Sequence, residues 1–397
     1  MRTNRRGFFG AALAGAGTLA GGMRPLGAQG PVRSARADDS SAPVPVVTPD
    51  LPALRPRRIH PDGIKEFHLV AEPVKRTFLP GRTVDCWGFN GTMPGPTIEV
   101  TQGDRVRLVV ENRLPELFSM HWHGFEIPFE MDGVPGLTQD PIAPGETFVY
   151  EFTLHQHGTF FYHSHMAMQE MMGMIGLFIM HPREAYRPHV QRDFGLVFQE
   201  WALRPNTTIP NTMAMDFNWF TINGRAGPAT TPLLVRQGER VRVRMVNMGM
   251  DHHPVHLHGH TFRTVATEGG RIPEPAWQPG NTVLLGVAQA RDVEFEATQL
   301  GDWVLHCHLP HHMMNQMVAM VGPLQMRHGT SADAPRVPGF PQDMFMDMDE
   351  MVSKPETRGL RPTWSGGMMG MMTMVRVLTP RAFDAIQAEI AAPREVA

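Results

Sequence analysis

The sequence has little cysteine, no excess of positive charge and no long, strongly apolar run, and each shortage excludes a class of protein. Two cysteines in 397 residues form at most one disulfide, so disulfides do not hold this chain together. The 36 Lys and Arg residues stand against 39 Asp and Glu residues, without the positive excess that binding to a nucleic-acid backbone usually requires. A membrane span needs about 20 strongly apolar residues. We therefore expect no disulfide framework, no nucleic-acid partner and no membrane span.

The residues that are plentiful describe a turn-rich globular chain. Hydrophobic residues make up 42% of the sequence and charged residues 19%, with 39 Gly and 36 Pro. This composition differs from that of disordered or collagen-like chains and allows a sizeable, mostly β core. At about 150 residues per domain, the length predicts more than one domain.

The first 28 residues resemble a twin-arginine export signal. The pair Arg5-Arg6 is followed by Phe8-Phe9, then by an uncharged Ala/Gly-rich stretch over 10–23 and by small residues suited to cleavage. That stretch is too short and too broken by Gly to serve as a permanent anchor. Residues 29–60, rich in Pro, Ala, Ser and Arg, predict a flexible leader. We expect export to the periplasm or secretion.

Two parts of the chain repeat the same motifs in the same order. An offset of 135 residues aligns 100–107 with 235–242 and 121–124 with 256–259, and an offset of 143 aligns 158–165 with 301–308. Both copies show short alternating runs bounded by Gly, Pro and Asn, which is typical of a β-sandwich. We predict one domain over 61–182 and a second over 183–326. A Met-rich extension over 327–397 follows, with a short helix at 379–390.

Histidine is the unusual component of this sequence. With 20 His residues in the chain, chance gives about one His-x-His pair. The sequence contains six: His121/His123, His155/His157, His163/His165, His256/His258, His258/His260 and His306/His308. Such clustering indicates metal binding.

The strand geometry of these pairs suggests how metals are held. The two histidines of a His-x-His lie on one face of a strand, whereas the middle residue points to the other face. The Cys307 thiolate therefore serves a different metal from His306 and His308. Two imidazoles, from His253 and His312, a thiolate and a weak thioether, ten residues after the cysteine at Met317, define a blue-copper electron-transfer site.

The duplication provides an internal control. At the positions of these four ligands, the first copy has Phe118, Ser164, Gln169 and Met174, so it lacks a blue site. Four His-x-His pairs survive across the two copies and offer eight imidazoles, which suit a cluster of three coppers. The pair His155/His157 matches no such position and is interpreted as a chance pair.

The motifs His121-Trp-His-Gly, Tyr162-His-Ser-His, His253-Pro-Val-His-Leu-His-Gly-His and His306-Cys-His-Leu-Pro-His-His resemble the four copper signatures of multicopper oxidases. The resemblance covers 61–326 and lacks the middle domain of longer laccases. It implies an all-β fold of two cupredoxin-like Greek-key β-sandwich domains, as in two-domain laccase-like enzymes, with type 1 copper in the second domain. Copper is the implied cofactor, with four ions per chain.

The resemblance also implies a role for each ligand. The type 1 ligands would be His253, Cys307, His312 and Met317, and the type 2 ligands His121 and His256. The type 3 pair would be held by His123, His163, His165, His258, His306 and His308. Asp132 would donate protons near the cluster. Longer relatives often carry a Glu where this chain has Pro310, so its proton route must differ.

These features predict an oxidase that takes single electrons from a small-molecule or metal-ion reductant and reduces O2 to water. The Met-rich tail suggests a cuprous oxidase, because thioethers are soft ligands suited to Cu(I). The alternatives are a general laccase-like oxidase of phenols and aromatic amines, a copper nitrite reductase and a copper-storage protein. In two-domain relatives the cluster forms between chains, so the resemblance implies a homotrimer.

Overall fold

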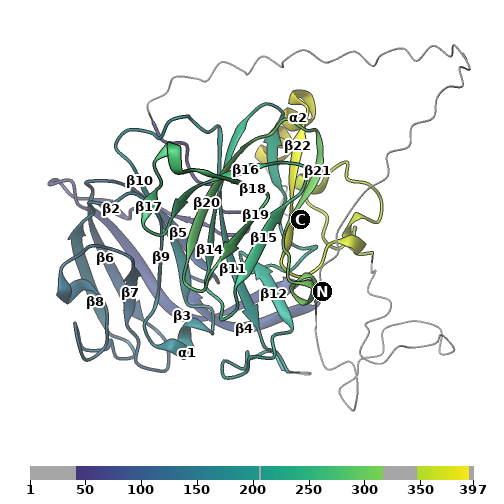
Figure 1. Ribbon diagram of the computed structural model, residues 1–397. Coiled ribbons are helices and arrows are strands. Elements are labelled where there is room, and N and C mark those ends of the chain that lie inside the picture. The colour runs from purple at the N-terminus through teal and green to yellow at the C-terminus, as the bar shows by residue number, and fades with distance from the viewer. Residues whose placement is uncertain (1–41, 205–206, 316–346, 393–397) are drawn as a thin grey trace, which may run out of the picture. The chain divides into compact units, whose positions relative to one another are not determined.

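The computed structural model describes residues 42–204, 207–315 and 347–392, and most of their regular structure is β (Figure 1). The predicted all-β fold is confirmed. The predicted export signal, the predicted ligand Met317 and several tail methionines lie outside the described residues. Within the described part of the chain, no helix is long and apolar enough to cross a membrane.

The first copy consists of two five-stranded sheets that pack face to face. Residues such as Leu69 and Leu108 from one sheet and Ile98 and Tyr162 from the other share one buried cluster. One sheet has the order β2-β3-β6-β8 with β4 on β3: β2 Arg58–Ile59, β3 Lys65–Leu79, β4 Arg82–Phe89, β6 Arg105–Asn112 and β8 Thr147–Thr153. The other has the order β1-β5-β10-β9-β7: β1 Ala53–Leu54, β5 Gly95–Thr101, β7 Met120–His123, β9 Gly158–Ser164 and β10 Ile175–His181.

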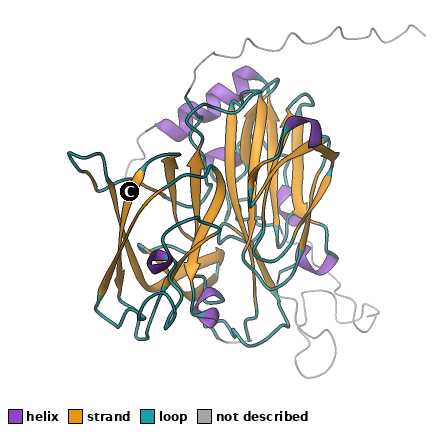
Figure 2. Ribbon diagram, turned by 60° about the vertical axis from the view of Figure 1, so that its left-hand side comes forward, coloured by secondary structure: helices purple, strands orange, loops and turns teal. Residues whose placement is uncertain are grey.

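The second copy also consists of two sheets, and strands dominate the regular structure of the described residues (Figure 2). Its larger sheet has the order β12-β11-β14-β20-β16-β17 with β18 on β16: β11 Arg192–Trp201, β12 Trp219–Ile222, β14 Arg240–Asn247, β16 Phe262–Thr267, β17 Gly270–Arg271, β18 Gln278–Gly280 and β20 Ala290–Glu296. Its smaller sheet has the order β13-β22-β21-β15-β19: β13 Leu233–Arg236, β15 His253–Leu257, β19 Thr282–Leu285, β21 Gly301–Cys307 and β22 Met372–Leu378.

Strand pairing repeats as the sequence does. In the first copy β3 pairs in parallel with β6 and β6 pairs antiparallel with β8, as β11, β14 and β20 do in the second copy. The strands that carry the His-x-His motifs are also neighbours in both copies, with His121 opposite His163 and His256 opposite His306.

The predicted Met-rich extension is in part a strand of the second domain, which corrects the boundary placed at residue 326. Strand β22 lies between β13 and β21, the place that β10 takes in the first copy between β5 and β9. Met371 is 0% exposed, and Met368, Met372 and Met374 form a buried cluster with Trp364 packed against it. The Gly-rich sequence around these methionines does not indicate a strand. The segment is buried only because β13 and β21 lie on either side of it.

The predicted flexible leader is also corrected for residues 42–60. Strand β1 pairs in parallel with β5, and Val47 bridges to Phe194 of the second copy. The Val46 backbone N–H donates to the Glu99 carboxylate at 2.9 Å. This part of the chain is thus held in both copies.

The remaining helices are short. Thr379 caps the helix α2, Pro380–Ala391, by accepting from the Ala382 N–H, at the place where the sequence predicted a helix. Its Phe383 and Ile386 pack against Leu234 of β13. The other helical segments are α1 Ala167–Glu170 and the 3-10 turns η1 Phe129–Met131, η2 Glu274–Ala276, η3 Pro310–Met313, η4 Pro355–Thr357 and η5 Trp364–Gly367.

Candidate metal centres

A thiol and two imidazoles converge in the core of the second copy. His253 begins β15, Cys307 ends β21 and His312 lies in η3, and all three are 0% exposed. The Cys307 Sγ lies 3.4 Å from the His312 Nδ1 and 3.8 Å from the His253 Nδ1, and the two Nδ1 atoms are 3.2 Å apart. The structure therefore brings together three of the four predicted blue-site residues.

A buried carboxylate fixes the ring of His253. Its Nε2–H donates to the Glu200 Oε2 at 3.1 Å, which leaves the Nδ1 facing the thiol. Glu200 also accepts from the Asp251 N–H, and a Cβ on Gly249 would displace the carboxylate from its present position. Glu200 is not among the residues predicted from the sequence, although an acid within the apolar run of β11 is a detectable signal.

Burial shapes the chemistry of this group. It raises the pKa of the Cys307 thiol to about 12, and it lowers the pKa of His312 to about 3, with repulsion from His253 and His311 adding to the effect. Neutral imidazoles and a soft sulfur donor are the ligands that copper prefers, and a metal would take the place of the thiol proton. The residues present fit a type 1 copper.

The Nε2 edge of the buried His312 ring faces a partly exposed carboxylate. Its Nε2 makes no hydrogen bond and lies 3.4 Å from the Asp251 Oδ2, while the neighbouring His311 is exposed. Ligand atoms of Asp251, His311 and His312 all lie within 4.8 Å of one another. A polar group thus connects the buried thiol site with the surface.

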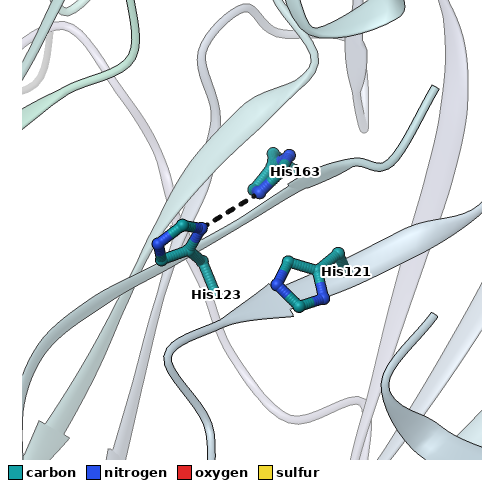
Figure 3. Close-up of side chains that lie close together, drawn as sticks. All are labelled: His121, His123 and His163. Atoms are coloured by element: carbon teal, nitrogen blue, oxygen red, sulfur yellow. Dashed lines mark hydrogen bonds between the residues drawn. The ribbon is translucent and has the colours of Figure 1, made fainter. Parts of the chain in front are cut away.

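The first imidazole group lies on β7 and β9 (Figure 3). Ligand atoms of His121, His123 and His163 lie within 4.8 Å of one another, and the His165 ring contacts that of His121. The Nδ1 atoms of His121 and His163 donate to the backbone carbonyls of Asp132 and Ser164, at 2.7 and 2.8 Å. These bonds leave the Nε2 atom of each ring as its metal-binding atom, and the His163 Nε2 lies 3.3 Å from the His123 Nδ1 (Figure 3).

The second imidazole group repeats this arrangement on β15 and β21. The rings of His256, His258, His306 and His308 contact one another. His256 donates to the Asn281 carbonyl at 2.7 Å and His306 to the Cys307 carbonyl at 2.8 Å.

Burial and neighbouring imidazoles lower the pKa of His123 to about 4 and lower those of His258 and His306. Neutral rings are ready to bind metal.

The two imidazole groups remain separate within one chain. Each ring contact among these eight histidines, all of which the structure describes, joins rings of the same copy. His165, His258 and His308 are exposed. Within one chain the eight histidines therefore form two separate groups of four, and their union in one cluster stays a prediction.

Two carboxylates lie beside the first group. The Asp132 Oδ1 is 3.6 Å from the His121 Nδ1, and the Asp132 carbonyl makes the closer contact, so its proton-donor role stays a prediction. The Glu170 Oε2 of α1 lies 3.2 Å from the His163 Nδ1 and was missed. Only the fold of α1 against β9 reveals this proximity.

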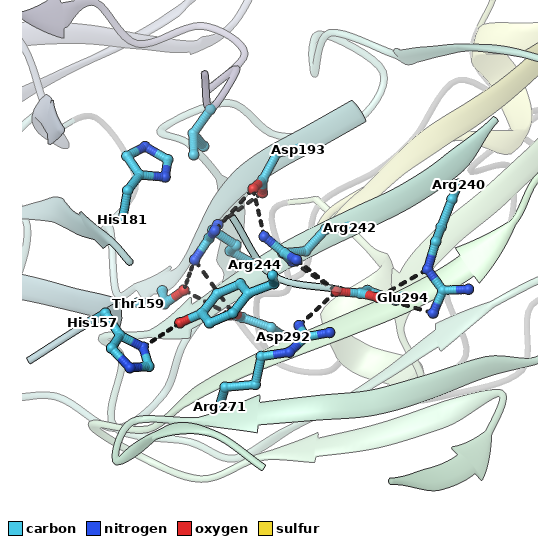
Figure 4. A network of polar contacts seen from close by, with 12 residues as sticks. His157, Thr159, His181, Asp193, Arg240, Arg242, Arg244, Arg271, Asp292 and Glu294 are labelled. Carbon is cyan, nitrogen blue, oxygen red and sulfur yellow. Dashed lines mark hydrogen bonds and ion pairs between the residues drawn. The ribbon is translucent and has the colours of Figure 1, made fainter. Parts of the chain in front are cut away.

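A buried ionic network lies between the two copies, apart from these sites (Figure 4). Arg244, 1% exposed, pairs with Asp193 and Asp292, and Asp292 accepts from Thr159 of the first copy. The predicted chance histidine His157 hydrogen-bonds to the Tyr186 hydroxyl at 2.6 Å at the edge of this network.

The fold and the donor set define a copper protein built from duplicated cupredoxin-like domains, and the comparisons with known proteins agree. Two multicopper oxidase family models match residues 71–185 and 200–323, which together make up more than half of the chain. The chain belongs to the multicopper oxidase family.

Individual relatives are similar over most of the described domains. A blue copper oxidase from Nitrosomonas europaea is 31% identical with a TM-score of 0.59, over 64% of this chain and 81% of that one. A copper resistance protein A homolog from Pseudomonas syringae pv. tomato is 28% identical over 73% of this chain and 56% of its own length. The multicopper oxidase MmcO of Mycobacterium tuberculosis is 27% identical over 74% of this chain and 61% of its own length. This chain thus spans about half the length of the curated relatives it matches.

Proposed function

We propose that the protein is a copper-dependent oxidase that passes single electrons from a reductant to O2. The observation that carries the proposal is the convergence of the Cys307 thiol with the Nδ1 atoms of His253 and His312. Copper bound there and at the imidazole groups would supply the one-electron oxidation of the reductant and the reduction of O2 to water. The chain fixes the geometry, with Glu200 holding His253 and β21 joining Cys307 directly to His306 and His308.

The eight imidazoles are assigned to a cluster of three coppers, which with the type 1 ion gives four per chain. His121 and His256 are proposed as type 2 ligands, and the other six histidines as ligands of the type 3 pair. Asp132 is proposed as the proton donor beside His121. Four of these rings have Nδ1 atoms that are already occupied by backbone carbonyls, which supports this assignment.

We propose a homotrimer in which each cluster forms between chains. The two imidazole groups of one chain are separate and partly exposed, so each needs a partner group. A head-to-tail contact between the first copy of one chain and the second copy of the next is heterologous and closes into a ring by rotation.

The proposed reductant is a metal ion, Cu(I) in particular. The support is the surface group beside His312, where the Asp251 carboxylate and the exposed His311 imidazole offer ligands to a cation next to a type 1 ligand. Copper resistance proteins among the relatives favour the same role, whereas laccases among them favour a phenol oxidase as the second candidate. A nitrite reductase is disfavoured, because copper nitrite reductases carry their blue copper in the first cupredoxin domain. In this chain the first copy has Ser164 at the position of the cysteine ligand. The twin-arginine pattern supports function in the periplasm or outside the cell.

The test is copper loading of the full chain, followed by metal analysis, O2 uptake and light scattering. We expect four coppers per chain, O2 uptake with Cu(I) faster than with a phenol, and a trimer. One copper per chain would indicate an electron carrier, and copper binding without O2 uptake a storage protein.

Complementation tests where the cluster forms. One variant carries His121→Ala with His123→Ala and the other His256→Ala with His258→Ala. In a head-to-tail ring, mixed trimers contain at least one junction with intact imidazole groups on both sides, so co-expression should restore part of the O2 uptake that each variant alone lacks. A cluster within one chain predicts no recovery.

A further inference from the structure

Strand β22, which pairs with β21, carries Met371 directly opposite Cys307. In the antiparallel ladder between β21 and β22, His306 is opposite Met372, and the Cys307 N–H donates to the Met371 carbonyl at 3.1 Å. Cys307 and Met371 are therefore directly opposed. Opposed residues of antiparallel strands place their side chains on the same face of the sheet. The Met371 side chain thus shares a face with the thiol.

The first copy repeats this arrangement bond for bond. There His163 is opposite Ile175, and the Ser164 N–H donates to the Met174 carbonyl at 3.1 Å. The Met174 N–H in turn donates to the Gln169 carbonyl at 3.3 Å, as the Met371 N–H donates to the His312 carbonyl at 2.9 Å. Since Ser164 and Gln169 correspond to Cys307 and His312, Met371 is the structural counterpart of Met174.

The sequence offset misses this equivalence because it counts straight through an insertion. Residues 170–173 separate Gln169 from Met174, whereas residues 313–370 separate His312 from Met371. An offset of 143 therefore pairs Met174 with Met317. In the structure, the segment that pairs with β21 after this insertion is β22.

The surroundings of Met371 suit a ligand. It is 0% exposed and belongs to the same core cluster as Cys307. The preceding Gly370 has a φ of 61°, and a Cβ there would lie 2.2 Å from the His312 carbonyl oxygen. Glycine allows the chain to pass directly against the histidine loop, so Met371 is held close to both His312 and Cys307.

We propose that Met371, from the Met-rich tail, supplies the axial thioether of the type 1 copper, in place of Met317. This assignment rests on the proposed function. It completes the donor set of two imidazoles, one thiolate and one weak thioether. The type 1 site is then split in sequence, since an insertion of residues 313–370 separates its third ligand from its fourth.

The experiment uses copper-loaded full-length protein with Met371→Leu, Met371→Gln and the matched Met317→Leu and Met317→Gln. The reduction potential of the blue chromophore is measured by redox titration, together with its electron paramagnetic resonance spectrum. Removal of an axial donor disfavours the more highly charged Cu(II) ion, so Met371→Leu should raise the potential. The amide oxygen of Met371→Gln is a harder donor than the thioether and favours Cu(II), so this variant should lower the potential. Both Met317 variants should leave the potential and spectrum unchanged. Met372→Leu, one residue along on the other face, is the neighbouring control.

A potential that shifts with Met317 and not with Met371 would overturn the assignment. Should the Met371 variants fail to fold, Met317→Gln decides alone: an unchanged potential and spectrum support Met371, and a change refutes it. Wild-type protein that binds copper without blue absorption would refute the proposed function and the assignment together, whereas a blue protein insensitive to Met371 would refute the assignment only.

Discussion

The two copies of the domain place different residues at the same location, and the contrast shows what a metal site requires. In the second copy, the Cys307 thiol and the Nδ1 atoms of His253 and His312 face one another in one buried group. In the first copy, Ser164 donates to the Gln169 side chain at 2.8 Å, and Gln169 donates to the Leu117 carbonyl at 2.8 Å. The buried polar atoms there satisfy one another, so the first copy needs no ion.

The two copies also differ in the sheet that contains β6 and β8 in the first copy and β14 and β20 in the second. Arg107 and Glu151 form a half-exposed pair at the surface of the first copy, whereas their counterparts Arg242 and Glu294 are 5% and 0% exposed. The second copy adds Arg244 where the first has Val109. One sheet faces solvent and the other faces its sister domain, so a nearly identical strand sequence is a surface in one copy and an interface in the other.

The largest expected effect comes from removing the strand that makes the second copy equivalent to the first. Truncation after residue 346 deletes β22 from between β13 and β21, which exposes two strand edges and the core around Val375. We expect loss of cooperative unfolding and of all blue absorption, by calorimetry and visible spectroscopy. Truncation after residue 379, which removes only α2, is the control and should keep both properties.

Exchanging the residues at the metal position tests the contrast directly. Cys307→Ser should abolish the blue absorption, because no other thiol lies between the imidazoles, while copper still binds at the imidazole groups. The reciprocal Ser164→Cys should not create a second blue site, since Phe118 and Gln169 provide no imidazole. Visible absorption and copper content measure both outcomes, and blue colour in Cys307→Ser would contradict the assignment.

Arginine substitutions should have unequal effects in the two copies. Arg244→Met leaves the buried Asp292 without its arginine partner and Asp193 paired with Arg242 alone, and should lower the free energy of unfolding by about 3–5 kcal/mol. Arg107→Met removes an ion pair at the surface and should change stability little. Denaturant titration of both variants provides the measurement, and equal losses would show that burial does not distinguish the copies.

Both copies carry an imidazole group, and protonation of these rings should have a smaller, pH-dependent effect on stability. The pKa of His123 is lowered to about 4, so this ring stays neutral in the folded copper-free protein while the unfolded chain takes up a proton below about pH 6.5. The unfolded state then binds more protons, and stability falls as the pH decreases from 6.5 towards 4. We expect the melting temperature of the copper-free protein to fall by a few degrees over this range, and by less in His123→Gln. A melting temperature independent of pH would contradict the lowered pKa.

The sequence alone determined the duplication, the sandwich strands and most candidate ligands. Alternation along a strand and the spacing of His-x-His pairs are local properties, so they can be recognised without knowledge of the fold. The absence of a blue site in the first copy also followed from Phe118 and Ser164. The eight cluster histidines and the three buried residues of the thiol site lie on or directly beside the predicted strands, which group them.

Only the tertiary structure decided which distant segments complete these elements. Met371 reaches Cys307 because β22 pairs with β21 after an insertion, and Glu200 near the end of β11 hydrogen-bonds to His253, the first residue of β15. Part of the leader, residues 42–60, pairs with β5. The tail methionines are buried in a sheet whose other strands come from distant parts of the sequence. Such contacts join residues far apart in the chain, and their energy comes from burial against partners that a local pattern does not specify.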